Sequence, residues 1–246
     1  MSEAAEASLQ RRVVAEGVGA ALLLATVVGS GIMGERLSGG SAGLALLANT
    51  LATGAVLVAL ILALGPISGA HFNPAVSLCL AWERAFPWRD VSRYVAAQFI
   101  GAVTGVLVAH LMFDLSPFSL SRHVRAGPAQ LFSEFVATFG LMAVVWGSSR
   151  LRSSSSVAVA VGCYITAAYW FTASTSFANP AVTFARSLSD SFSGIRPADV
   201  PGFAIAQLLG AVSATLLFRW LAPVSPAPPV QAVALGVESR SRRERA

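Results

Sequence analysis

The chain has 246 residues, of which 55% are hydrophobic and only 12% are charged. Soluble domains typically carry about 25% charged residues, so the composition excludes a disordered chain and argues against an ordinary soluble enzyme. The net charge of +5 comes from arginine without any lysine. These arginines lie between apolar runs and at the C-terminus, which favours a membrane protein over a nucleic-acid-binding protein.

Six apolar segments follow one another along the chain, each close to the roughly 20 residues that a helix needs to cross a bilayer. The first contains Glu16 and has no clear cleavage site, which argues against a signal peptide. We therefore predict an all-α membrane protein with six transmembrane helices. The segments cover residues 13–34, 43–64, 91–113, 129–149, 155–173 and 200–222.

Arginine positions predict the orientation, because cytoplasmic loops carry an excess of positive charge. With the N-terminus inside, the outside loops hold only Arg36, Arg122, Arg125 and Arg196. We therefore expect a multi-pass protein of the inner cell membrane with both termini in the cytoplasm. The inside then holds Arg11, Arg12, Arg84, Arg89, Arg93, Arg150, Arg152, Arg240, Arg242, Arg243 and Arg245.

Three landmarks occur twice in the same order, which indicates a duplicated unit. Glu16 pairs with Glu134, and the segment Ala97–Ala102 pairs with Ala206–Ala211. Between these landmarks, each half contains the sequence Asn-Pro-Ala-Val. Each unit has three spans, an odd number, so the two copies must cross the membrane in opposite directions. We expect Glu16 and Glu134 to be structural groups that bind loop backbone, in preference to proton-relay groups.

The apolar segments and the repeat predict the domain organisation. Residues 1–11 form a cytoplasmic N-terminus, and residues 12–222 form one channel-like domain with repeats at 12–114 and 129–222. Residues 223–246 begin with a Pro-rich stretch and end in an Arg cluster, which is typical of a disordered cytoplasmic tail.

A short apolar stretch follows each second span, at residues 74–82 and 180–188, and is too short to cross the membrane. Asn is a favoured N-cap and Pro a favoured first helical residue, so each Asn-Pro-Ala motif predicts the start of a short helix. The motifs are Asn73, Pro74, Ala75 and Asn179, Pro180, Ala181. Their matched places predict two re-entrant half-helices beside a buried or water-filled cavity.

The paired motifs, with Ser68–Val76 around the first and Phe177–Ala181 around the second, resemble the aquaporin, or major intrinsic protein, family. The resemblance covers about residues 12–222. It implies two half-helices that meet at the membrane midplane, one pore per subunit, a homotetramer, and passage of water and small neutral solutes. The pore-loop residues that would expose backbone carbonyls are Gly69, Ala70, His71, Ser176, Phe177 and Ala178.

Most members of the family have an arginine directly after the second Asn-Pro-Ala, where this chain has Val182. Counting along the motif-bearing segments places the other filter positions at Thr53, Ala167 and Ser176. This set is small and uncharged, so we expect a wide filter that admits glycerol-like solutes. It resembles a divergent bacterial branch associated with metalloids and organoarsenicals.

Arg186 lies four residues after Val182, on the same face of the short helix. One helical turn is about 5.4 Å, which places Arg186 near the outer vestibule, where it would repel cations and attract partly anionic solutes. The alternative is an anchor whose long stem lies along apolar surface.

Two other function classes stay open: a secondary carrier with alternating access, and a low-flux membrane scaffold. A carrier is also built from inverted repeats. We expect no enzymatic activity, because the sequence has no recognisable catalytic base, nucleophile or phosphate loop. We also expect no cofactor, no metal site and no nucleic-acid partner.

Overall fold

The computed structural model describes residues 7–151 and 154–223, so most of the predicted tail lies outside the described residues. Within them the chain is helical, without a β-strand. Helix α1 begins at Leu9, inside the predicted N-terminal segment, because Ser8 caps it by accepting a hydrogen bond from Arg11 N. The long helices are α1 (Leu9–Leu37), α2 (Ala42–Ser68), α4 (Trp88–Met112), α5 (Pro128–Leu151), α6 (Ser154–Phe171) and α8 (Val200–Leu221).

Three short elements lie between the long helices. Helices α3 (Pro74–Trp82) and α7 (Pro180–Arg186) are the two predicted half-helices, and the 3-10 turn η1 (Pro197–Asp199) precedes α8. Helix α7 ends two residues before its predicted end, because Ser187 caps it and the chain turns there.

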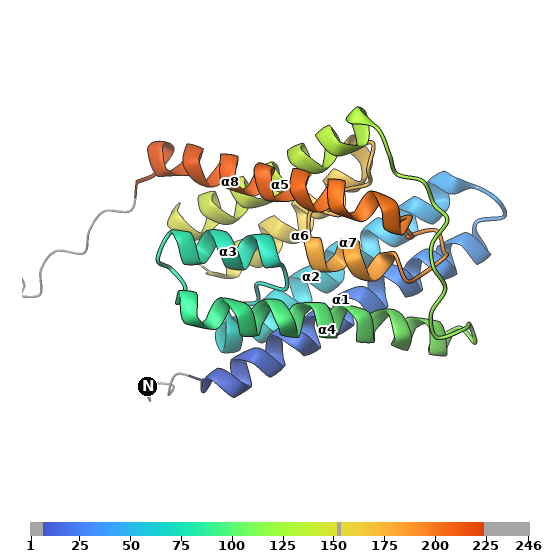
Figure 1. The fold of residues 1–246 in the computed structure, drawn as a ribbon, viewed down its shortest axis with the longest axis horizontal. Helices are drawn as coiled ribbons and strands as arrows, with labels where there is room; N and C mark the ends of the chain where they lie inside the picture. The colour runs from blue at the N-terminus through green and yellow to red at the C-terminus, as the bar shows by residue number, and fades with distance from the viewer. Residues whose placement is uncertain (1–6, 152–153, 224–246) are drawn as a thin grey trace, which may run out of the picture.

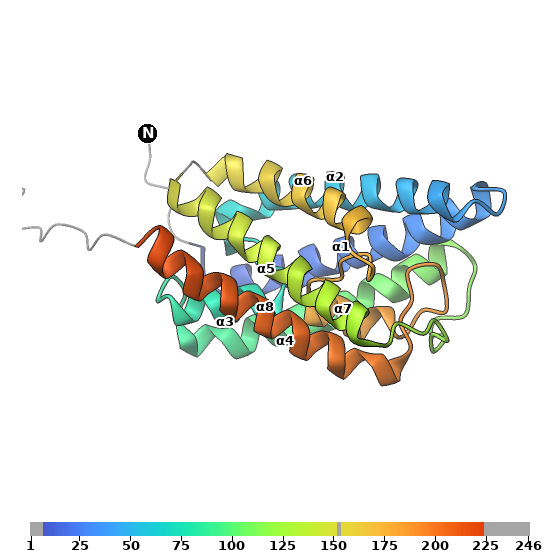
Figure 2. The same ribbon diagram turned by 90° about the horizontal axis from the view of Figure 1, so that it is seen from above.

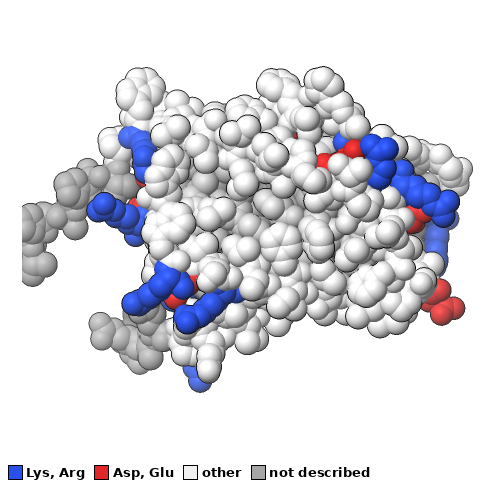
Figure 3. Space-filling model, viewed as in Figure 1, with Lys and Arg blue, Asp and Glu red and all other residues white. Residues whose placement is uncertain are grey.

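Five of the long helices are long and apolar enough to cross a membrane, and the apolar part of α6, Ser156–Phe171, is shorter. Figure 3 shows charged side chains gathered at the two ends of the molecule, with an uncharged band between them. Both ends of the described chain lie at the left of Figure 1, as an even number of crossings requires.

The packing repeats between the two halves. Helix α1 packs against α2 and α4 as α5 packs against α6 and α8, and α2 joins the halves by packing against α6. A Cβ on Gly101 of α4 would overlap the Gly17 carbonyl oxygen of α1, and one on Gly210 of α8 would overlap the Phe135 carbonyl oxygen of α5. Glycine therefore sets the close approach of both helix pairs.

Helices α3 and α7 lie inside this frame, with α3 toward the left half of the molecule and α7 toward the right half (Figures 1 and 2). Each contacts both α4 and α8, so each half-helix is held by a long helix from either repeat.

Candidate functional site

Both half-helices begin with the predicted Asn-Pro-Ala sequence, and both asparagines act as N-caps. The Asn73 side-chain oxygen accepts a hydrogen bond from Ala75 N at 2.9 Å, and the Asn179 side-chain oxygen accepts one from Ala181 N at 3.0 Å. A half-helix N-terminus carries a partial positive charge.

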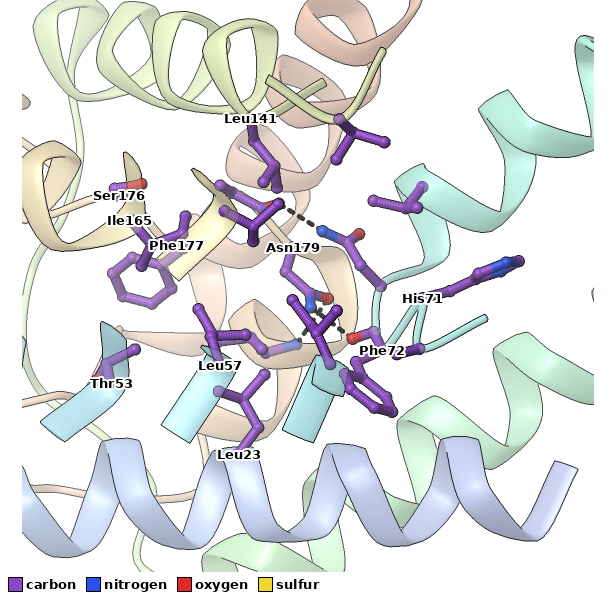
Figure 4. Close-up of a pocket in the computed structure, with 18 of the residues that line it drawn as sticks. Leu23, Thr53, Leu57, His71, Phe72, Leu141, Ile165, Ser176, Phe177 and Asn179 are labelled. Carbon is purple, nitrogen blue, oxygen red and sulfur yellow. Dashed lines mark hydrogen bonds between the residues drawn. The ribbon is translucent and has the colours of Figure 1, made fainter. Parts of the chain in front are cut away.

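The two motifs are joined by reciprocal hydrogen bonds across the repeat. Asn73 Nδ2 donates to the Ala178 carbonyl at 2.8 Å, and Asn179 Nδ2 donates to the Phe72 carbonyl at 2.7 Å (Figure 4). Each amide carries a second N–H, which these bonds leave free.

Glu16 holds the first pore loop. Its carboxylate accepts hydrogen bonds from His71 N at 2.9 Å, Phe72 N at 2.7 Å, Ser68 Oγ at 2.8 Å and Gln98 Nε2 at 2.7 Å. Glu16 is fully buried. A buried carboxylate costs free energy unless it is hydrogen-bonded, and four donors supply those bonds.

Glu134 does the same for the second pore loop. It is fully buried and accepts from Phe177 N at 2.8 Å, Ala178 N at 2.9 Å and Gln207 Nε2 at 2.6 Å. The two carboxylates therefore hold loop backbone, which is the structural placement expected from the sequence.

The pore loops have unusual backbone conformations. Ala70, Phe72, Ser176 and Ala178 have φ angles between 47° and 49°. This left-handed region is uncommon for residues other than glycine, and it persists only where the surroundings impose it. Here the Glu16 and Glu134 hydrogen bonds impose it.

A cavity of about 130 Å³ runs past the N-terminal ends of both half-helices and is also lined by α1, α2, α5 and α6. It extends from Val76 and Leu80 on α3, past Asn73 and Asn179, to Val182 on α7. In Figure 4, Thr53, Ile165, Ser176 and Phe177 gather on one side of Asn179, and His71 and Phe72 lie on the other. A water molecule occupies about 30 Å³ in the liquid, so the cavity has room for several.

Three of the four predicted filter residues, Thr53, Ser176 and Val182, line this cavity. Ala167 does not, and the prediction for this residue is wrong, because it is exposed on the outer face of α6. Ile165 and Tyr169 line the cavity instead, and Tyr169 Oη donates to Thr53 Oγ1 at 3.4 Å. Two residues along a helix correspond to a rotation of about 200°, so Ala167 faces the opposite way.

The side chain of Arg186 is only 1% exposed and lines the cavity. Its Nε donates to the Ser193 carbonyl, and its guanidinium carbon lies 3.4 Å from the centre of the Phe177 ring. The surface-anchor alternative is therefore wrong. Arg186, Phe177 and Tyr169 also line the cavity, so the predicted set of small residues does not include every side chain that borders it.

A second arginine supports this region from the loop between α4 and α5. Arg125 donates from Nε to the Gly194 carbonyl at 2.7 Å and from Nη1 to the Ser174 carbonyl at 3.1 Å. Its guanidinium carbon lies 5.0 Å from the centre of the Phe177 ring. Burial lowers the pKa of this guanidinium from its usual range. Arg125 is not among the residues that line the cavity.

The inverted repeat around two capped half-helices matches a known family. The model of the major intrinsic protein family matches residues 3–176 and 148–240. The chain belongs to the major intrinsic protein family. Aquaglyceroporin AqpS of Rhizobium meliloti (strain 1021) is 58% identical over 225 residues, which cover 92% of this chain and 95% of that protein.

Other similarities agree with this assignment. Probable aquaporin AqpM of Archaeoglobus fulgidus is 35% identical over 181 residues, covering 68% of this chain and 72% of that protein. The solved aquaglyceroporin of Plasmodium falciparum has the same fold, with a TM-score of 0.67, 21% identity, and coverage of 86% of this chain and 96% of that one. This member of the major intrinsic protein family is a passive membrane channel for water and small neutral solutes.

Sequence reasoning missed Tyr169, Ile165 and the contacts of Arg186. For Arg186, the repeat itself was an available signal. Leu80 lies seven residues after Asn73, and Arg186 lies seven residues after Asn179, so the two occupy matching positions in the half-helices. Among residues 7–151 and 154–223, no group of three or more His, Cys, Asp or Glu side chains is placed to hold a metal ion.

Proposed function

We propose that this channel conducts solutes of glycerol size and larger, because small side chains border one end of its pore. The supporting observation is the first turn of α7, where Val182 lines the cavity together with Thr53 and Ser176. An arginine at position 182 would occupy much of this space. The resemblance to the metalloid-associated branch adds arsenous acid and a methylated arsenical to the solutes worth testing.

The central part of the proposed pore offers both donors and acceptors to a permeating solute. The donors are the second N–H groups of Asn73 and Asn179. The acceptors are the carbonyl groups of Ala70, His71 and Ser176, which receive no hydrogen bond from the described part of the chain. A hydroxylated neutral solute replaces its water partners with these groups, whereas a cation meets the positive ends of two half-helices.

We also propose where the channel lies in the cell and how it is oriented in the membrane. Arginine distribution supports both termini in the cytoplasm, with the α7 end of the pore facing outward. The bacterial relative supports an inner-membrane location. We further propose a homotetramer with one pore in each subunit, and no enzymatic activity, cofactor or nucleic-acid partner.

Proteoliposome swelling across neutral solutes of increasing size tests the proposed width. We expect glycerol and larger polyols to enter, and Val182→Arg to reduce flux of the larger ones about tenfold, which corresponds to a barrier increase of about 1.4 kcal/mol. Val182→Ile is the matched control, since it changes the volume little and adds no charge. An unchanged size limit in Val182→Arg contradicts the proposed filter, and flux that saturates or depends on an ion gradient indicates a carrier.

A further inference from the structure

The two half-helices present matching residues to the cavity, with one charged exception. Val76 and Val182 each lie three residues after the capping asparagine, and both line the cavity. Leu80 and Arg186 each lie seven residues after it, and both also line the cavity. The second repeat therefore has a guanidinium group where the first has an isobutyl group.

This guanidinium group is buried without a full set of partners. Arg186 is 1% exposed, its Nε donates to the Ser193 carbonyl and its side chain also hydrogen-bonds to Tyr169, but within the described residues its Nη1 has no hydrogen-bond partner. No carboxylate in this part of the chain forms an ion pair with it, and Glu134 already accepts from two backbone N–H groups and Gln207. A buried cation without partners costs free energy, so such a group indicates a missing acceptor.

A second polar group at this end of the cavity also lacks a partner. Ser176 is 2% exposed and lines the cavity, and among the described residues its Oγ makes no hydrogen bond. The neighbouring Thr53 hydroxyl is already used, because it donates to the Asn49 carbonyl at 2.8 Å and accepts from Tyr169. The two free groups, Ser176 Oγ and Arg186 Nη1, are both able to donate.

The position of the guanidinium group is fixed from two sides. One is the Phe177 ring, whose centre lies 3.4 Å from the guanidinium carbon. The other is the loop after α7, where Ser193 Oγ lies 3.3 Å from Ser191 Oγ and Ser191 Oγ lies 2.8 Å from Ser189 Oγ. This serine chain ends at His110 Nε2 on α4, 2.8 Å from Ser189 Oγ. A group held in this way loses little conformational freedom when it binds a ligand.

We propose that Arg186 and Ser176 form a binding subsite for small carboxylates at the α7 end of the pore. An ionised carboxylate suits these two donors, because it accepts hydrogen bonds at both oxygens and is attracted by the positive charge of the guanidinium group. The apolar side chains of Val182 and Ile165 line the same cavity and suit the short carbon chain of such a ligand. The positive charge repels cations at the same place. This inference rests on the proposed channel function.

Competition against glycerol flux in proteoliposomes tests the subsite. The probe is glycolate at pH 8, where its carboxyl group is ionised, and ethylene glycol is the neutral control of similar size. Osmolarity and ionic strength are held constant with chloride. We expect glycolate to inhibit glycerol entry at concentrations where ethylene glycol does not. Equal inhibition by both solutes overturns a carboxylate subsite.

Variants then assign the effect to Arg186. Arg186→Leu introduces the residue of the first repeat, and we expect the inhibition constant of glycolate to rise about tenfold or more. Arg186→Lys keeps the charge without the fixed donor geometry of the guanidinium group and gives an intermediate value. Ser176→Ala removes the second donor and gives a smaller rise. Arg186→Lys and Ser176→Ala test the subsite even if Arg186→Leu does not fold. Each variant is first shown to be monodisperse in detergent.

Arg122→Gln is the control for surface charge. Arg122 lies in the loop between α4 and α5 with its side chain 90% exposed, and it pairs with Asp190 at 3.3 Å. We expect this variant to keep the glycolate inhibition of the unmodified protein. If it weakens inhibition as much as Arg186→Leu does, surface potential explains the effect and the subsite is overturned. Absence of glycerol flux in the unmodified protein contradicts the channel proposal instead, so the two failures are distinguishable.

Discussion

The two pore loops have the same backbone but present different side chains. Residues 68–77 and 174–183 correspond one to one, and left-handed φ angles recur at the same places, Ala70 with Ser176 and Phe72 with Ala178. In both, a buried glutamate and a glutamine from the third long helix of the repeat hold the loop. The two repeats therefore share one framework, which consists of a glutamate and a glutamine in each repeat. This framework holds the N-termini of the two half-helices against each other.

The differences lie beside this framework. In the first loop, His71 Nδ1 lies 3.0 Å from Ser77 Oγ, and its ring packs against Phe86 and Tyr94. In the second loop the matching residue is Phe177, whose ring faces the Arg186 guanidinium. Backbone donors must be paired in both repeats, whereas a side chain that lines the cavity is free to differ. The asymmetry of the pore therefore comes from a few side chains on a symmetric backbone.

The largest expected effect comes from removing the carboxylates of the framework. Glu134→Ala leaves Phe177 N and Ala178 N buried without their acceptor, at a cost of about 1–3 kcal/mol for each group, and removes one of the two acceptors of Gln207 Nε2. Glu16→Ala removes four hydrogen bonds, including the one from the Ser68 hydroxyl, so we expect it to be at least as damaging. Thermal unfolding in detergent, followed by light scattering and circular dichroism, measures both.

The control for these variants is Glu35→Ala, since Glu35 is an exposed carboxylate near the end of α1. We expect its unfolding temperature to match that of the unmodified protein. A Glu134→Ala protein that unfolds at the same temperature as Glu35→Ala would mean that Glu134 does not hold the second loop.

A smaller effect is expected at the two glycines where helices of the same repeat meet. Alanine at Gly101 or Gly210 places a methyl group against a backbone oxygen, which moves less easily than a side chain. We expect each variant to lose about 1–3 kcal/mol of stability, and the two losses to be similar. Gly65→Ala is the control, because nothing lies within 4 Å of its added Cβ. Very unequal losses at Gly101 and Gly210 would show that the packing of the two repeats is not equivalent.

We expect the smallest effect on stability from Ser176→Cys and Ala70→Cys. The two positions correspond in the two repeats, and both line the cavity. We expect each to create sensitivity to mercurials, with a membrane-impermeant mercurial added outside blocking only Ser176→Cys. The native Cys79 is buried and Cys163 is exposed, and neither is among the residues that line the cavity. Strong block of the unmodified channel that disappears when either native cysteine is replaced would contradict this placement. Stopped-flow water permeability measures the block.

The sequence alone determined the features that depend on local chemistry. Six apolar runs predicted the long helices to within a few residues, because crossing a bilayer requires a minimum length of apolar helix. The Asn-Pro-Ala motifs predicted both half-helices, because the capping and first positions of a helix have strong residue preferences. The inverted arrangement followed from an odd number of spans per repeat.

Only the tertiary structure decided which side chains enter the pore. Counting back from the second Asn-Pro-Ala motif predicts Ala167, but Ile165 and Tyr169 line the cavity, because the count cannot show which face of α6 turns inward. The sequence placed Arg186 one turn beyond Val182. Whether its head turned outward or into the cavity depended on Phe177 and Ser193, which no local pattern links to it. Phe177 precedes α7 and Ser193 follows it, so both contacts form only when the loops on either side of α7 fold against the helix.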